Sequence, residues 1–203
     1  MIQPDYCLKV IGHECIRPYD CTLVNPASID LRLGNIIRQP RWVWRNPATR
    51  PLAWAFSAKN PKTNPDQFWG RPFSFETFTL WPGQFVLCHS LEEIEIPLDH
   101  VGILYSKSST GRVGLEHLHA GYADPGFYGQ LTFEFSNMAP WPVLLTAGQP
   151  LMQLVFEQLN GRPDNSYAAT GRYQGQQGPT AARQEKFFTQ NGSESSVRSV
   201  SND

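Results

Sequence analysis

Short stretches in which apolar and polar residues alternate recur through much of the chain. In the stretch 130–136, QLTFEFS, apolar side chains stand at every second position, so Thr132 and Glu134 point away from the apolar face of a strand. Further strands are expected at 28–34, 73–80, 84–88, 92–96, 101–105, 141–145 and 151–156. Turn residues such as Pro82-Gly83 separate them, and their spacing of about ten residues predicts an all-β fold, a jelly-roll-like sandwich or barrel.

Two of these strands contain polar positions that need an explanation. The strand at 28–34 is expected to be half-buried, because Ile29, Leu31 and Leu33 alternate with polar residues. Gln153 is a lone amide in an otherwise apolar strand. Burying an amide without a partner costs about 1–3 kcal/mol, so Gln153 must bond either the backbone or a ligand.

Two segments lack a clear period. Residues 1–17 are compatible with a strand or with a short helix. Residues 38–72 hold several tryptophans among many prolines: Trp42, Trp44, Trp54 and Trp69. We interpret this segment as a loop held onto the domain, in preference to a ligand platform or a partner surface.

One domain is expected over residues 1–188. Within it, residues 160–188 turn to Gly, Asn, Ser and Gln and form a candidate lid. Residues 189–203 have almost no apolar content and are expected to be a disordered polar tail.

The charge balance and the cysteines narrow the possible partners. The net charge of the 203 residues is −1, from 17 basic and 18 acidic side chains, which disfavours nucleic acid or an anionic membrane as a partner. No stretch approaches the roughly 18 apolar residues of a membrane span. The four cysteines show neither a CxxC pair nor metal-ligand spacing, so reduced thiols in a cytoplasmic protein are expected.

The stretch 106–137 combines three kinds of candidate chemistry. Lys107, Ser108, Ser109 and Arg112 offer two hydroxyls and two cations within six residues, which suits phosphate oxygens. The sequence ADPG at 123–126 is typical of a tight turn. Glu134 then supplies one carboxylate on the polar face of a strand.

Four motifs in this order carry a family resemblance: SSTGRVGL, AGYADPGFYGQLTFEFSN, GQPLMQLVF and RYQGQQGPTAAR. Together, over roughly residues 18–183, they resemble the dCTP deaminase branch of the dUTPase-like superfamily, and most closely its bifunctional, dUMP-forming members. The resemblance implies a distorted jelly-roll with short peripheral helices, assembled as a homotrimer with sites between subunits. The motif PASIDLRLG resembles a scaffold motif of the family.

The resemblance also assigns roles to individual residues. Glu134 matches the catalytic glutamate, while Ser108, Arg112 and the backbone carbonyl of Ala120 match groups that position the water. The triphosphate would be held by the segment Lys107, Ser108, Ser109, Thr110, Gly111 and Arg112, and by a C-terminal clamp of Tyr167, Arg172 and Gln176. Asp124 matches the residue that accepts a hydrogen bond from the deoxyribose 3′-hydroxyl, and Thr132, Phe133 and Gln153 lie where base and sugar are read.

A metal-free route to deamination is favoured over a zinc route. His13-Glu14-Cys15 superficially resembles half of a zinc deaminase motif, but no PCxxC follows. Attack of water on cytosine C4 then needs a carboxylate such as Glu134 to move the proton. His117 and His119 could share a metal, but without a third ligand a structural or pocket-lining role is favoured. Magnesium is expected on the nucleotide triphosphate.

The expected activity is deamination of dCTP to dUTP and ammonia, followed by hydrolysis to dUMP and pyrophosphate, a supply of dTTP precursors. The second step is predicted from Gly121 and Tyr122, where deaminase-only relatives carry a bulky basic pair, with Gly121 leaving space for a hydrolytic water. The alternatives are a deaminase that releases dUTP, a dUTPase without deamination, and a non-catalytic jelly-roll binding or assembly protein. Inhibition by dTTP and activity on modified cytosines stay open.

Overall fold

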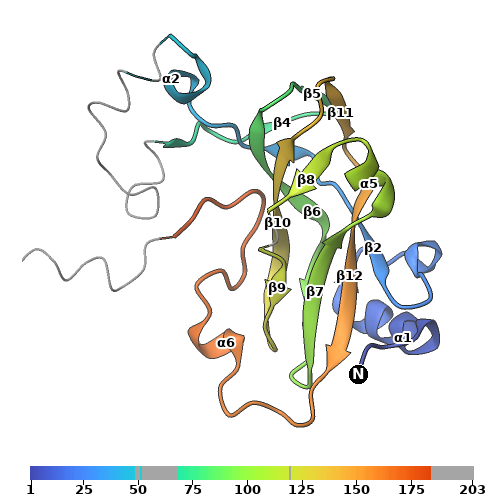
Figure 1. Cartoon of the computed structure of the whole chain (residues 1–203). Coiled ribbons are helices and arrows are strands. Elements are labelled where there is room, and N and C mark those ends of the chain that lie inside the picture. Colours follow the sequence, from blue (N-terminus) through green and yellow to red (C-terminus); the bar gives the residue numbers. More distant parts are fainter. Residues whose placement is uncertain (49–50, 52–67, 119, 184–203) are drawn as a thin grey trace, which may run out of the picture.

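Two antiparallel four-stranded sheets form the body of the protein (Figure 1). The first has the order β1 (Ile16–Arg17), β6 (Phe85–Glu95), β10 (Tyr128–Asn137) and β8 (Leu115–His117). The second has the order β2 (Ile29–Arg32), β12 (Pro150–Gln158), β7 (His100–Ser106) and β9 (Tyr122–Ala123). The computed structural model describes residues 1–48, 51, 68–118 and 120–183. These residues confirm the all-β class and the jelly-roll-like fold, although the sheets do not close into a barrel.

Two smaller strand pairs extend the sheets at one end. They join β11 (Val143–Thr146) to β5 (Thr77–Leu80) and β3 (Ile36–Ile37) to β4 (Phe73–Ser74). Residues 38–72 join β3 to β4 along the chain. The described ends of that segment meet where Pro40 bridges Trp69 and where the Gly70 amide donates to the Gln39 carbonyl at 2.8 Å.

The core lies between the two sheets. From the first sheet, Phe133 and Phe135 are fully buried, with ring centroids 5.8 Å apart. From the second sheet, Leu154 and Phe156 face them and are equally buried. Each such side chain stabilises the fold by roughly 1.5–3 kcal/mol. The alternation in β10 therefore sends its phenylalanines into the core and turns Glu134 to the other face.

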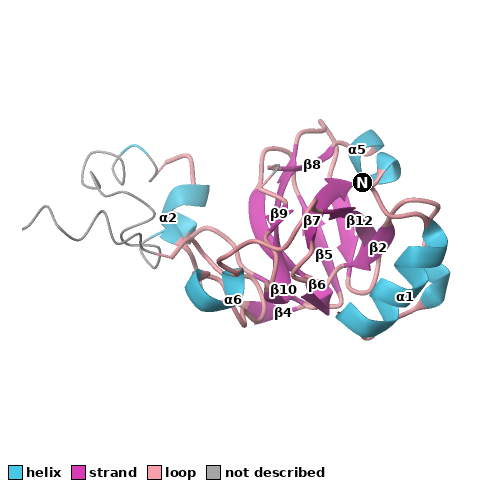
Figure 2. Cartoon of the chain, turned by 90° about the horizontal axis from the view of Figure 1, so that it is seen from below, coloured by secondary structure: helices cyan, strands magenta, loops and turns pink. Residues whose placement is uncertain are grey.

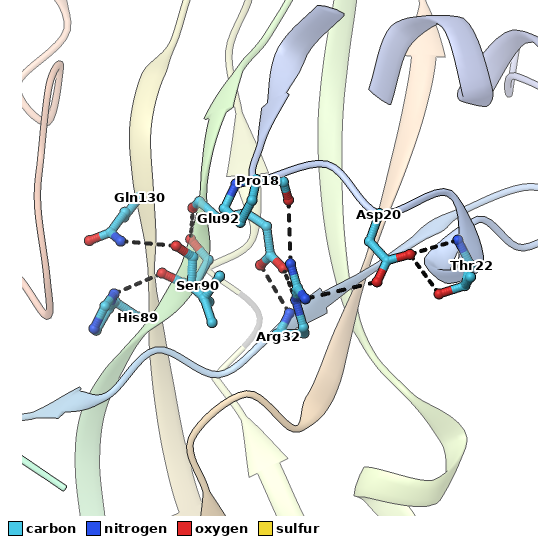
Figure 3. Close-up of polar contacts among 9 residues, drawn as sticks. Pro18, Asp20, Thr22, Arg32, His89, Ser90, Glu92 and Gln130 are labelled. Atoms are coloured by element: carbon cyan, nitrogen blue, oxygen red, sulfur yellow. Dashed lines mark hydrogen bonds and ion pairs between the residues drawn. The ribbon is translucent and has the colours of Figure 1, made fainter. Parts of the chain in front are cut away.

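A single long strand, β6, replaces the two strands expected at 84–88 and 92–96. The register with β10 shifts between Gln130 and Thr132, so β6 bulges there instead of ending. The Ser90 hydroxyl donates to the Glu92 carbonyl at 2.7 Å and accepts from the Leu131 amide at 2.8 Å. The Gln130 side chain donates to the Leu91 carbonyl at 3.2 Å (Figure 3). Because side chains hydrogen-bond the backbone groups left unpaired at the bulge, the polar residues here lie within a continuous strand and do not form a turn.

The polar positions of β2 are also buried or ion-paired, which corrects the half-buried strand that the alternation predicted. Asp30 is 7% exposed and pairs with the Lys107 ammonium. The Arg32 guanidinium lies 2.7 Å from a carboxylate oxygen of Glu92, whose side chain is 1% exposed (Figure 3). Arg32 also approaches Asp20 at 4.0 Å. Ion pairs to residues distant in the sequence thus allow charged side chains inside this part of the sandwich.

The N-terminal segment forms helix α1 (Asp5–Cys15), which resolves the ambiguity of residues 1–17. Leu8, Gly12 and Cys15 make up its buried stripe. A Cβ on Gly12 would lie 2.5 Å from the Tyr19 ring, so glycine permits this close packing. Figure 2 shows α1 at the margin of the strands.

The remaining described helices are single turns at the periphery: 3-10 helix η1 (Cys21–Leu23), α2 (Trp42–Arg45), α5 (Ser108–Arg112) and α6 (Tyr167–Thr170). They confirm the expected short peripheral helices. Among the described residues, no helix is long and apolar enough to cross a membrane. The cytoplasmic location stays a prediction, and the tail predicted at 189–203 lies outside the described residues.

Candidate active site

A cavity of about 420 Å³ opens beside the outer face of β10. Its wall combines residues from β6, β9, β10, the turn after β9, the end of the 38–72 segment and the C-terminal segment. They are Trp69, Phe85, Leu87, Ala120, Tyr122, Ala123, Asp124, Phe127, Leu131, Thr132, Glu134, Tyr167, Tyr173, Gln176, Thr180 and Ala182. Seven residues predicted from the sequence therefore meet at one cavity: Ala120, Tyr122, Asp124, Thr132, Glu134, Tyr167 and Gln176.

Glu134 stands in the middle of β10, opposite Leu87 of β6. Its side chain is 22% exposed, yet Oε2 is buried without an aligned hydrogen bond. Oε2 lies 3.1 Å from Nε2 of His117, which is buried at the end of β8. The carboxylate thus has one inner oxygen beside an imidazole, while its exposed part faces the cavity. This placement suits a general base that acts on a molecule in the cavity.

A tight turn presents Asp124 to the cavity. The Phe127 amide donates to the Asp124 carbonyl at 3.0 Å, and Gly126 adopts a φ of +82°. Proline at the second position and a positive-φ glycine at the third are the features of a type II turn. The turn predicted from ADPG is therefore present, and it holds a carboxylate on the wall shared with Glu134.

Gly121 has a packing role that the sequence did not reveal. Its carbonyl accepts from the Leu104 amide at 2.7 Å, and a Cβ on Gly121 would lie 2.7 Å from the Leu104 carbonyl oxygen. Gly121 does not line the cavity, whereas its neighbour Tyr122 does. The space predicted beside Gly121 is thus filled by β7, because this segment runs against that strand. Any steric effect on the cavity at this turn comes from Tyr122, which is 63% exposed.

The C-terminal segment covers the cavity by hydrogen-bonding to β10. The Gln176 side chain donates to the Gln130 carbonyl at 2.6 Å, and the Gln130 amide donates to the Gln176 carbonyl at 3.0 Å. Farther along, the Thr180 amide donates to the Thr132 hydroxyl at 3.2 Å. Figure 1 shows this segment running beside β9 and β10. In the described structure, the segment predicted as a lid is therefore seated on the wall of the site.

Tyr167 anchors the same cover on the turn. Its amide donates to the Pro125 carbonyl at 2.9 Å, and its ring lies 5.8 Å from that of Phe127. The Tyr167 hydroxyl accepts from the Tyr173 amide at 3.2 Å. Tyr167 thus joins turn and cover, although the sequence assigned it to the triphosphate.

The predicted phosphate-binding residues lie outside this cavity. Helix α5 presents Ser108, Ser109, Gly111 and Arg112, and all four are exposed. Thr110 is buried, and its hydroxyl donates to the Leu151 carbonyl at 2.7 Å, which gives it a structural contact.

The other residues that the sequence assigned to the ligand also lie elsewhere. Lys107 pairs with Asp30, and the Gln153 amide oxygen accepts from the Ser28 hydroxyl at 3.4 Å. Phe133 is buried in the core, and Arg172 is absent from the cavity wall. One chain therefore divides the predicted site into a cavity with a carboxylate and a separate exposed cluster of hydroxyls and a cation.

The aromatic wall of the cavity was not predicted from the sequence. Trp69, from the segment interpreted as a loop, lies 5.4 Å from the Phe85 ring, and both line the cavity. Leu131 and Tyr173 also reach it. The one available signal was the density of tryptophans in 38–72, and it could not single out Trp69.

Among the described residues, no group of three or more His, Cys, Asp and Glu side chains could hold a metal ion.

The geometry can be compared with that of known proteins. A family profile described as dCTP deaminase-like matches residues 7–159. The chain belongs to this family. A protein of Mycolicibacterium vanbaalenii named "dCTP deaminase, dUMP-forming" is 38% identical over 187 residues, which cover 89% of this chain and 92% of that protein. A protein of Mycobacterium avium with the same name is 40% identical over 87% of this chain and 90% of its own length.

A solved structure supports the fold independently. The 2′-deoxycytidine 5′-triphosphate deaminase of Agrobacterium tumefaciens superimposes with a TM-score of 0.59 at 20% identity. The match covers 77% of this chain and 48% of that chain, so this chain spans about half the length of that protein. At this identity the likeness concerns the fold.

Proposed function

We propose that this protein converts dCTP to dUMP, releasing ammonia and pyrophosphate, the dUMP-forming activity named for its relatives. The observation that carries the proposal is the position of Glu134: a partly exposed carboxylate on the wall of a covered cavity, in a chain of the dCTP deaminase-like family. A general base at this place can activate a water molecule without a bound metal.

In the first step, water adds to C4 of the cytosine. Glu134 takes one proton from the water and delivers it to the ring nitrogen N3, so that negative charge does not build up on the ring. Glu134 then takes the remaining proton from the new C4 hydroxyl and gives it to the amino group, the C4–N bond breaks, ammonia leaves, and the water oxygen remains as the C4 carbonyl of dUTP. The backbone carbonyl of Ala120, which lines the cavity, would help to orient the water.

In the second step, a water molecule attacks the α-phosphorus of dUTP, and the bond to the bridging oxygen breaks to give dUMP and pyrophosphate. This chemistry depends on positioning and on neutralising phosphate charge. Asp124 would hold the sugar 3′-hydroxyl, and Tyr122, which brings no charge to the wall, would leave the phosphates free to align.

A homotrimer would complete the site. Ser108, Ser109 and Arg112 are exposed on α5 and do not reach the cavity of their own chain. A neighbouring copy that placed its α5 beside the cavity would bring these groups to the triphosphate. Light scattering tests this assembly, and an active monomer would refute it.

Magnesium would enter with the substrate. Asp124 and Glu134 are the carboxylates on the described wall of the cavity, and no described group of three suitable ligands exists. A cation in this site would therefore be held mainly by triphosphate oxygens, as part of the nucleotide complex. Bound there, it would neutralise phosphate charge, while the chain's own residues would hold the base and sugar.

The test is incubation of the purified protein with each deoxynucleoside triphosphate and magnesium, followed by separation of the products and assay of ammonia. The proposal predicts ammonia, dUMP and pyrophosphate from dCTP. Accumulation of dUTP would leave a deaminase alone. Hydrolysis of dUTP without ammonia from dCTP would identify a dUTPase, and no turnover of any nucleotide would favour a binding protein. A parallel series with dTTP added would reveal inhibition.

A further inference from the structure

His117 is held rigidly beside the proposed general base. It lies at the last position of β8, directly opposite Phe135 of β10, and is 2% exposed. Its ring meets the rings of Phe133 and Phe135 edge to face, at centroid distances of 6.3 and 6.0 Å. Packing on two core phenylalanines leaves the imidazole little freedom to turn.

The polar edge of this ring faces one partner. Nε2 of His117 lies 3.1 Å from Oε2 of Glu134, and both atoms are buried without another hydrogen bond. Strand β7 and helix α5 also pack near β8. Among the described residues, however, neither provides a second ion pair to His117. A buried polar atom is costly to leave unpaired, and one proton between these two atoms would satisfy both.

The two oxygens of Glu134 are therefore not equivalent. Oε2 is buried against the imidazole, while the side chain as a whole is 22% exposed and lines the cavity. The backbone of the same residue is tied to the strand end beyond His117, because the Leu118 amide donates to the Glu134 carbonyl at 3.2 Å. Only Oε1 is left to meet a water molecule in the cavity.

We infer that His117 is a positioning residue for Glu134. The His117 imidazole donates a hydrogen bond from Nε2 to Oε2 of Glu134 and thereby directs Oε1 at the reacting water. This inference rests on the proposed function for its catalytic consequence. The bond fixes the carboxylate rotamer, because a charge-assisted hydrogen bond holds Oε2 at one position. A carboxylate free to turn would lose the alignment that proton transfer requires.

The experiment compares two substitutions of similar length. His117→Gln keeps an N–H donor, whereas His117→Met fills the space without one. The matched control is His100→Met. His100 is 8% exposed, packs on Phe156 at a centroid distance of 6.5 Å and lies away from the cavity wall.

The inference predicts that His117→Met lowers kcat for ammonia release by about 10- to 100-fold, with KM for dCTP changed by less than about threefold. His117→Gln should recover most of kcat, and His100→Met should match the wild type. An unchanged kcat in His117→Met would overturn the inference, as would a loss that His117→Gln fails to relieve.

Two NMR measurements on nucleotide-free protein separate this inference from the proposed function. The ¹³C signal of the labelled Glu134 carboxyl should move in His117→Met relative to the wild type, even if dCTP is not the substrate, because the substitution removes a hydrogen-bond donor to Oε2. In the wild type, ¹⁵N shifts should show the His117 proton on Nε2, a result that does not depend on any variant folding. A proton on Nδ1 alone would overturn the inference, while shifts as predicted without ammonia release would overturn the proposed function instead.

Discussion

Replacement of Glu134 by glutamine tests the proposed chemistry most directly. The amide has the size and shape of the carboxylate but cannot take a proton from water at neutral pH. The side chain stands on a strand between two core phenylalanines, so the substitution should leave the backbone of β10 in place. Any loss of activity can then be assigned to the missing base.

The size of the loss follows from the role and the surroundings. General base catalysis contributes about 10²–10⁴-fold in rate, and each factor of ten corresponds to about 1.36 kcal/mol of barrier. Asp124, the other carboxylate on the described wall, lies in the turn after β9 and is proposed to hold the sugar. No described neighbour is thus placed to replace Glu134, so we expect a loss of about 10³-fold or more, roughly 4 kcal/mol or above.

The stability of Glu134→Gln, unlike its activity, should rise slightly or stay the same. Glutamine can still accept the hydrogen bond of the His117 imidazole through its amide oxygen, and a neutral amide costs less to bury than a carboxylate. The free energy of unfolding of Glu134→Gln should therefore equal that of the wild type or exceed it by up to about 1 kcal/mol.

The assay is ammonia release from dCTP, alongside nucleotide binding by calorimetry and unfolding by urea. The matched control is Glu157→Gln on β12, whose side chain is 45% exposed and outside the cavity wall. Glu134→Gln should bind dCTP within about threefold of the wild type and release almost no ammonia. Retention of more than a few per cent of the wild-type rate would show that the base lies elsewhere.

Three further substitutions test other parts of the account. Tyr122→Arg should slow pyrophosphate release at least about tenfold while ammonia release continues, because a bulky cation would enter the wall near the phosphates. A dCTP time course that still ends in dUMP at the wild-type rate would contradict this. Trp69→Ala should raise KM for dCTP about tenfold, or about 1.4 kcal/mol, through loss of an aromatic wall. An unchanged KM would place Trp69 outside the binding surface. Arg32→Met should lower the free energy of unfolding at neutral pH by about 3–5 kcal/mol, since Glu92 would lose its ion partner. Burial raises the pKa of Glu92, so as pH falls the Glu92 carboxylate is protonated in the folded protein before it is protonated in the unfolded chain. A neutral Glu92 no longer needs its ion partner, so the stability lost in Arg32→Met should shrink as pH falls through this raised pKa. Urea unfolding with an equal loss at neutral and acidic pH would refute the role of the pair.

Much of the fold could be read from the sequence because its signals are local. Alternation over a few residues sets which face of β10 is apolar, and therefore that Glu134 faces away from Phe133 and Phe135. The order ADPG dictated a turn because Pro and Gly restrict φ within the segment itself. Motif order then led to the family, whose profile matches residues 7–159.

Where the sequence analysis erred, a distant partner had changed the meaning of a local pattern. Two separate strands were expected at 84–88 and 92–96, yet hydrogen bonds to β10 keep β6 continuous. Asp30 suggested an exposed face, yet Lys107, 77 residues away, pairs with it. A polar residue in a strand is usually exposed, because its burial costs free energy unless a partner from elsewhere in the chain pairs with it.

The sequence by itself supplied the candidate groups of this protein: a carboxylate on one strand, an acidic turn and a cluster of hydroxyls with a cation. Only the tertiary structure decided what surrounds them. It set Trp69 into the cavity wall, pressed Gly121 against Leu104 and placed His117 beside Glu134. The reason is that side-chain type and strand period are encoded within a few residues. The distances between groups depend instead on the path of the whole chain, which no short stretch specifies.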